Sequence, residues 1–117
     1  MAKDDMEVIM YKILKYLYEC LKSGRETSIA DVAWKCRLFD ITRTYWLVIM
    51  QELIDCGYVS GVQYVGAKDM EQVIETGTFR ITKAGREYLL QNSTMQKIRK
   101  SLGEPFEILL GGVIGKL

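Results

Sequence analysis

Side chains that can contact nucleic-acid bases and phosphates gather on the segment from residue 42 to residue 57. Thr44, Tyr45 and Gln51 carry groups that can reach base edges, and Arg43 can hold a phosphate or a guanine. These groups can serve one ligand only if they project from the same side of a rigid element. The segment must therefore form an element with one buried side and one open side.

The segment is predicted to be a helix that begins after Thr42 and ends at Gly57. The Thr42 hydroxyl can accept a hydrogen bond from a free N–H of the first turn, and glycine suits the left-handed conformation that ends many helices. Apolar residues recur at the i, i+3, i+4 and i+7 spacing of a buried helix face, namely Trp46, Ile49, Met50 and Leu53. The open side is then expected to carry Thr44, Val48, Gln51 and Asp55, flanked by Tyr45, Leu47 and Glu52.

The open side of this helix also offers contact with a protein. Leu47 and Val48 are predicted to lie there next to Tyr45, and apolar groups clustered on an exposed helix face are typical of protein interfaces. The candidate protein-interaction residues are therefore Tyr45, Leu47 and Val48.

The elements on either side of this helix predict a winged helix-turn-helix. A short helix, capped at Ser28 and extending to Cys36, and a turn over residues 37–40 precede it. Three segments follow it in the order strand, loop or long hairpin tip, and returning strand, namely residues 58–65, 66–76 and 78–81. A hairpin placed directly after the second helix of the turn motif distinguishes the winged form from the plain one.

The remaining segments are predicted to be mostly helical. A first helix over residues 5–22 follows a capping box formed by Asp4 and Glu7. Thr82 begins another helix, which Asn92 separates from a helix over residues 95–102. The residues expected to face inward after Thr82 are Ala84, Gly85, Tyr88 and Leu89. The expected fold class is thus mainly α with a small β-hairpin (α+β), a winged helix-turn-helix with a C-terminal helical extension.

Two parts are predicted along the chain. Residues 1–102 form the winged helix-turn-helix domain with its C-terminal helices. Residues 103–117 form an apolar tail for which three outcomes are open: packing on its own domain, dimerisation or disorder. Pro105 can start a helix in this tail, but three glycines weaken it.

The composition of the 117-residue chain is that of one folded domain without a metal site. Hydrophobic residues make up 49% and charged residues 26%, which excludes wholesale disorder. There is no histidine and no C-x-x-C pair among the three cysteines, so zinc binding and histidine-based catalysis are excluded. We expect no enzyme activity and no cofactor. The start lacks a signal-peptide pattern and no apolar run is long enough for a bilayer, so a cytoplasmic protein without a membrane partner is expected.

The charge of the chain is small and unevenly distributed. Sixteen basic and 15 acidic residues leave a net charge of +1. Residues 42–57 and 66–76 together hold two cations, Arg43 and Lys68, against five anions, a net charge of −3 that disfavours phosphate contacts. Residues 83–100 hold five cations and one anion, and form either a solvated helix face or a patch that grips a nucleic-acid backbone. The candidate nucleic-acid-binding residues are Arg43, Thr44, Tyr45, Gln51, Lys68, Lys83 and Arg86.

Several turn and cap motifs match those of a known family. They are Ile41-Thr42, the stretch from Leu53 to Val59 with Gly57 and Tyr58, Gly61-Val62-x-Tyr64, Ile81-Thr82-Lys83-x-Gly85-x-x-Tyr88-Leu89 and Asn92-x-Thr94. With these motifs the chain resembles the YjcQ family from the first helix to Ser101. The resemblance implies a winged-helix fold and an origin in phages or prophages of Gram-positive bacteria. It implies no catalytic residue, and it does not cover the tail after Gly103.

Two functions are compatible with these residues. The first is a winged-helix DNA-binding protein, a phage- or prophage-related transcriptional regulator that binds double-stranded DNA. The second is a protein–protein interaction or homodimerisation module of such a system that binds no DNA. DNA binding predicts an affinity that falls with salt and with loss of Arg43, whereas protein binding predicts a dimer or partner complex that depends on Leu47 and Val48.

Overall fold

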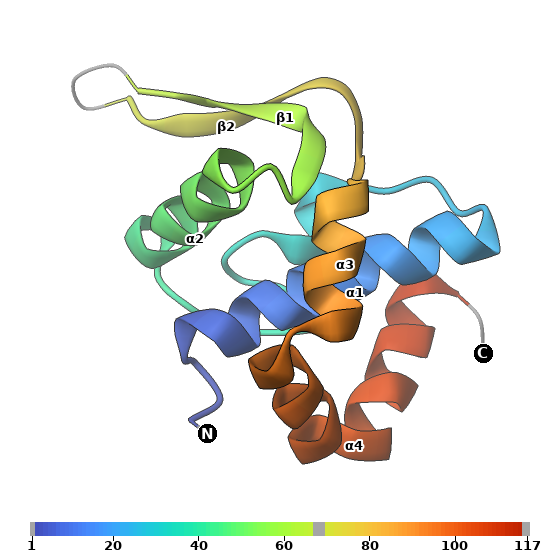
Figure 1. The fold of residues 1–117 in the computed structure, drawn as a ribbon. Coiled ribbons are helices and arrows are strands. Elements are labelled where there is room, and N and C mark those ends of the chain that lie inside the picture. The colour runs from blue at the N-terminus through green and yellow to red at the C-terminus, as the bar shows by residue number, and fades with distance from the viewer. Residues whose placement is uncertain (1, 67–69, 116–117) are drawn as a thin grey trace.

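A computed structural model describes residues 2–66 and 70–115 of the chain. Its elements in chain order are α1 (Met6–Ser23), the 3-10 helix η1 (Ile29–Val32), α2 (Arg43–Asp55), β1 (Val59–Val65), β2 (Gln72–Ile81), α3 (Lys83–Gln91) and α4 (Ser93–Ile114) (Figure 1). Four α-helices and a two-stranded antiparallel hairpin confirm the predicted α+β class. The order of the elements is consistent with a winged helix-turn-helix.

Helix α1 lies at the centre of the core, and α2, α3, α4 and β2 all contact it. Residues on several sides of the helix are buried, among them Ile9, Ile13, Leu14 and Leu17. The predicted capping box at its start is wrong. The N-cap residue is Asp5, whose side chain caps no helical N–H and instead accepts a hydrogen bond from the Ala2 amide.

The helix predicted from Ser28 to Cys36 is wrong, because only the single 3-10 turn η1 forms there. The buried Tyr16 side chain of α1 explains the difference. Its hydroxyl donates to Asp31 Oδ2 at 2.6 Å and accepts from the Ser28 amide at 3.1 Å. Tyr16 therefore occupies the Asp31 carboxylate and the Ser28 amide, which would bond each other in a capping box, and the chain is extended again at Ala33.

Helix α2 begins and ends as predicted. The Thr42 hydroxyl accepts from the Tyr45 amide at 3.2 Å, which caps the first turn. Gly57 has a φ of 74°, and the amides of Gly57 and Tyr58 donate to the carbonyls of Ile54 and Leu53. This pair of bonds is a Schellman motif, which ends the helix and turns the chain directly into β1. The predicted inward residues Trp46, Ile49, Met50 and Leu53 are all buried.

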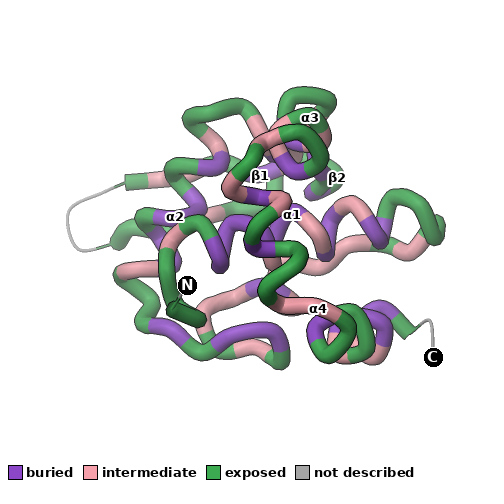
Figure 2. Tube along the Cα trace, turned by 60° about the horizontal axis from the view of Figure 1, so that its bottom comes forward, coloured by how far each residue is buried: buried purple, intermediate pink, exposed green. Residues whose placement is uncertain are grey.

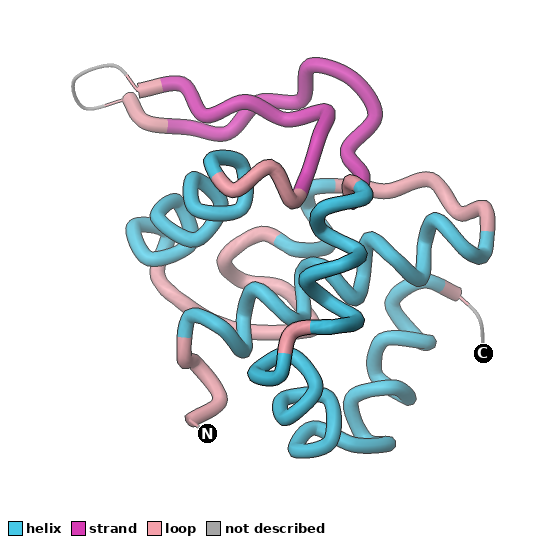
Figure 3. The backbone as a smooth tube through the Cα atoms, viewed as in Figure 1, coloured by secondary structure: helices cyan, strands magenta, loops and turns pink. Residues whose placement is uncertain are grey.

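The hairpin pairs Val59 with Ile81 at its base and Val65 with Gln72 toward its tip, with an irregularity between Ser60 and Val62. Strand β2 begins at Gln72, so the predicted loop over residues 66–76 is too long. Residues 72–76 lack a clear apolar period and become a strand through pairing with β1. Phe79 and Ile81 at the base are buried, and the Thr27 hydroxyl donates to the Phe79 carbonyl. The far part of the hairpin extends over α2 (Figure 3).

Helices α3 and α4 close the other side of the core. Thr82 caps α3 by accepting from the Gly85 amide at 3.0 Å, and Gly85 packs so closely on the Tyr58 carbonyl that a Cβ would overlap it. Leu89 is buried as predicted and Tyr88 is half-buried, whereas Ala84 is exposed, contrary to expectation. The Tyr88 ring stacks on Tyr58 with 4.4 Å between the ring centroids.

Helix α4 bends at Gly103, which has φ 61° and ψ −156°, and Pro105 follows the bend. The second half folds back on α1, where Phe106 meets Tyr11 with 6.0 Å between ring centroids. Phe106, Leu110 and Ile114 are buried, and buried positions alternate with exposed ones along α4 (Figure 2). Of the three outcomes left open for the tail, residues 103–115 therefore show packing on their own chain. Within the described ranges, no helix has the length and apolar character to span a membrane.

Candidate functional site

The open face of α2 carries five exposed residues: Thr44, Val48, Gln51, Glu52 and Asp55. Four of them, Val48 to Asp55, line a shallow depression of about 210 Å³ together with Cys56, the residue that follows the helix. Val48 is 47% exposed and supplies the apolar part of this depression. The depression thus has an apolar side chain beside two carboxylates, Glu52 and Asp55.

The predicted exposure of Leu47 is wrong, since the side chain is only 4% exposed. Leu47 lies one turn after Arg43 on α2, and Arg43 bonds the Glu71 carbonyl next to β2. The apolar period of α2 leaves Leu47 at the border of the buried face, and tertiary packing decides that this border is buried. Of the three predicted protein-interaction residues, only Val48 projects fully from the open face.

Arg43 connects α2 to the hairpin. Its Nη2 donates a hydrogen bond to the Glu71 carbonyl, and its guanidinium lies 5.6 Å from the centroid of the Trp34 ring. Trp34 in turn meets Trp46 edge to face, with centroids 5.4 Å apart. The predicted phosphate ligand is therefore engaged within the chain, although its side chain remains exposed.

Tyr45 is half-buried and points toward the N-terminal segment, where its hydroxyl donates to the Asp4 carbonyl at 2.7 Å. Burial, and then the nearby carboxylates of Asp5, Glu7 and Asp4, raises the pKa of this hydroxyl. Tyr45 borders a second, more open depression of about 440 Å³, lined also by Asp4, Lys35, Asp40, Ile41 and Thr42. The sequence offered no signal for this depression, because separate segments form it.

The other basic residues predicted to bind nucleic acid are not found beside Arg43. Lys83 and Arg86 lie on α3, which begins where the Thr82 hydroxyl donates to the Gly57 carbonyl, beyond the far end of α2. Since Arg43 opens a helix of 13 residues, these cations are separated from it along the axis by roughly 20 Å. Lys83 also pairs with Glu87 at 3.9 Å, and Lys68 lies outside the described residues.

The open face of α2 and the hairpin together form an acidic surface. Its described charges are two cations, Arg43 and Arg80, against four anions, a net charge of −2; the anions are Glu52, Asp55, Glu71 and Glu75. None of these four carboxylates forms an ion pair with a described residue. We call this set the acidic α2–hairpin surface. Across the part of the chain that the structure describes, no three His, Cys, Asp or Glu side chains are grouped as metal ligands.

The fold defines a small α+β protein in which α2 and the hairpin together carry an excess of acidic side chains over the described residues. The model of a protein family described as "YjcQ protein" matches residues 11–104. The chain therefore belongs to the YjcQ family, as its cap and turn motifs predicted. No curated protein and no solved structure matches the chain.

Proposed function

We propose that the chain is a winged-helix protein-interaction module, and not an enzyme, whose binding site is the acidic α2–hairpin surface. The observation that supports this proposal is the charge of that surface, a net −2 over the described residues with no ion pair to neutralise its carboxylates. A DNA duplex is bound largely through its phosphates, so an anionic surface repels it. A protein surface rich in Lys and Arg is the complementary partner.

The apolar groups of the surface support the same proposal. Val48 lies beside Glu52 and Asp55, and Ile74 and Met70 of the hairpin are also exposed, the latter at 70%. Protein interfaces commonly combine an apolar centre with a charged rim. The role in phage or prophage systems that the family resemblance implies is part of this proposal.

Site-specific photo-crosslinking tests the proposal in living cells. A photoreactive residue replaces Val48 in the full chain, and the adducts are separated and identified by mass spectrometry. We expect a protein adduct that is lost when Glu52→Lys and Asp55→Lys are added. The matched control places the same group at Ile108, which is 56% exposed on α4 and should not give that adduct.

Two results of the crosslinking experiment would contradict the proposal. One is a nucleic-acid adduct from position 48 without a protein adduct. The other is a protein adduct that forms equally well in the presence of the two lysine substitutions, because charge complementarity would then have no part in binding.

The second candidate function is DNA binding by the same face, as in a transcriptional regulator. Thr44 and Gln51 favour it, because both are exposed, lie on the same side of α2 and carry groups that can pair with base edges. Titration with a 20-base-pair duplex, repeated at salt concentrations from about 20 mM to about 200 mM, tests this candidate. Affinity should fall with salt and with Gln51→Ala if duplex DNA is bound, and absence of binding at the lowest salt would exclude it.

A further inference from the structure

Helix α4 carries a second charged surface that the proposed function does not use. Lys97, Arg99 and Lys100 are exposed on its first half. Lys3 of the N-terminal segment lies close to them, because it lines a small depression together with Ser101 and Leu102. We call these four cations the basic α4 surface.

The cations on α4 are not neutralised within the chain. No described residue forms an ion pair with Lys97, Arg99 or Lys100, and Arg99 only donates a hydrogen bond to Gln96 at 3.1 Å. On α1, by contrast, Lys15 and Lys22 both pair with Glu19, at 3.3 Å and 2.8 Å. The basic α4 surface is thus available to an anionic partner.

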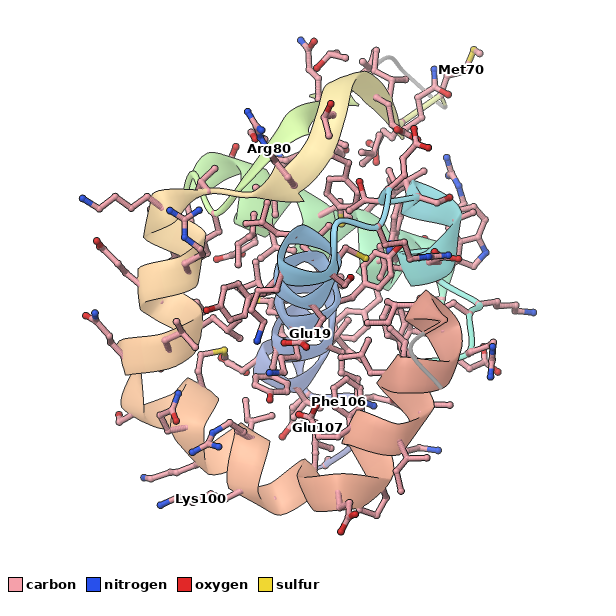
Figure 4. All side chains as sticks on the ribbon, turned by 90° about the vertical axis from the view of Figure 1, so that its right-hand side faces the viewer. Glu19, Met70, Arg80, Lys100, Phe106 and Glu107 are labelled. Carbon is pink, nitrogen blue, oxygen red and sulfur yellow. The ribbon has the colours of Figure 1, made fainter. Side chains whose placement is uncertain are left out.

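The hairpin and the first half of α4 lie at opposite ends of the molecule in Figure 4, where Met70 and Lys100 mark them. Among the described residues, no ion pair joins the acidic α2–hairpin surface to the basic α4 surface. A chain whose net charge is only +1 therefore presents a negative surface and a separate positive surface.

We propose that the basic α4 surface of one copy binds the acidic α2–hairpin surface of a second copy. The proposal rests on the proposed function and identifies the basic partner as this chain itself. Contact between two different surfaces is heterologous, so each added copy leaves a free surface at each end and assembly continues head to tail. The attraction acts between exposed charges and is weakened by salt.

A second copy fits the basic α4 surface better than a nucleic acid does. Only four cations form the surface, which limits the number of phosphates that can be bound. A long polyanion would also be repelled by the acidic α2–hairpin surface of neighbouring bound copies. A second copy matches each surface with its opposite and requires no further component.

Charge exchange between two variants of the full chain tests the proposal. Variant A carries Lys97→Glu and Lys100→Glu, and variant B carries Glu52→Lys and Asp55→Lys. Sedimentation velocity at about 20 mM and about 500 mM salt measures assembly over a range of protein concentrations. We expect the native chain to assemble at low salt only, A and B to associate at least tenfold more weakly when alone, and an equimolar mixture of A and B to assemble again.

A matched control separates the effect of position from that of net charge. Lys35→Glu with Lys83→Glu changes the charge by the same amount as variant A, at exposed positions outside the basic α4 surface. This variant should assemble like the native chain. Circular dichroism checks that each variant is folded.

Three outcomes would overturn the inference: a native chain that stays monomeric at low salt, a mixture of A and B that does not assemble, and low-salt duplex binding that variant A loses. Failure of the inference is distinguishable from failure of the proposed function. If position 48 crosslinks to a different protein while A and B do not assemble, the protein-interaction function stands and only self-assembly is excluded.

Discussion

The indole Nε1 of Trp46 donates a hydrogen bond to the carbonyl oxygen of Val32 across 2.6 Å, and both residues are buried. This bond connects α2 to η1, which occupies the place of the first helix in the predicted turn motif. Since η1 is only one turn long, it is too short to be stable by itself. The bond from Trp46, together with the bonds of Tyr16 to Ser28 and Asp31, therefore holds that part of the chain in position.

Replacement of Trp46 by Phe should destabilise the fold by about 1–3 kcal/mol, because it removes a buried donor and reduces the volume that packs on Trp34. Urea denaturation measures the change. Trp34→Phe is the matched control and should cost less, since Trp34 is only half-buried. Equal costs for the two substitutions would show that the Val32 bond contributes little.

Leu47 and Val48 are neighbours in the sequence with opposite environments, at 4% and 47% exposure. Leu47→Asp should destabilise the chain by about 3 kcal/mol or more, because it buries a carboxylate without a partner. Val48→Asp should change the free energy of unfolding by about 0.5 kcal/mol or less. Urea denaturation of both variants checks this pair of values, and a tolerated Leu47→Asp would refute the burial of Leu47.

Arg43→Ala should loosen the hairpin without unfolding the core, because the guanidinium bonds the Glu71 carbonyl from an exposed position. Amide hydrogen exchange should become faster in residues 70–76, while the amides of α1 keep their rates. We expect a loss of about 1 kcal/mol or less in global stability. Arg80→Ala, on the hairpin itself, is the control. If amide exchange in residues 70–76 becomes equally fast in this variant, the bond from Arg43 has no special role.

Tyr11 makes the fold sensitive to alkaline pH. Burial, with the Glu107 carboxylate as the next cause, raises the pKa of Tyr11 from 10.0 to about 12. The folded chain thus keeps a proton that the unfolded chain loses, so this contribution is complete below pH 10 and is lost as the pH rises toward 12. The loss amounts to about 2 kcal/mol.

Tyr11→Phe removes this titration, so the variant should lose less stability than the native chain between pH 9 and about 11.5, as urea midpoints at several pH values will show. Burial and the Asp31 hydrogen bond also raise the pKa of Tyr16, so a residual decline in the variant is expected. If the free energy of unfolding falls equally with rising pH in the variant and in the native chain, the assignment to Tyr11 is contradicted.

The parts of the fold that depend on neighbouring residues were predictable. Thr42 and Thr82 cap their helices through amides three positions away. Gly57 ends α2 where its own amide and that of Tyr58 donate to carbonyls three and five positions earlier. The buried side of α2 follows from its apolar period, and the separation of α3 from α4 follows from Asn92, whose side chain accepts from the Thr94 amide. These interactions span a few residues, so their signals are contained in short stretches of sequence.

The tertiary structure decided what depends on residues far apart in the chain. Tyr16 holds Ser28 and Asp31, so the predicted capping box does not form. Leu47 is buried and Arg43 bonds the Glu71 carbonyl, which removes two residues from the predicted contact face. The separation of the hairpin from the α4 cations, which Met70 and Lys100 mark in Figure 4, also required the fold. The sequence by itself determined the caps of α2 and α3, the buried side of α2 and the charges of each element, whereas only packing between distant segments decided which side chains meet, because no local pattern records it.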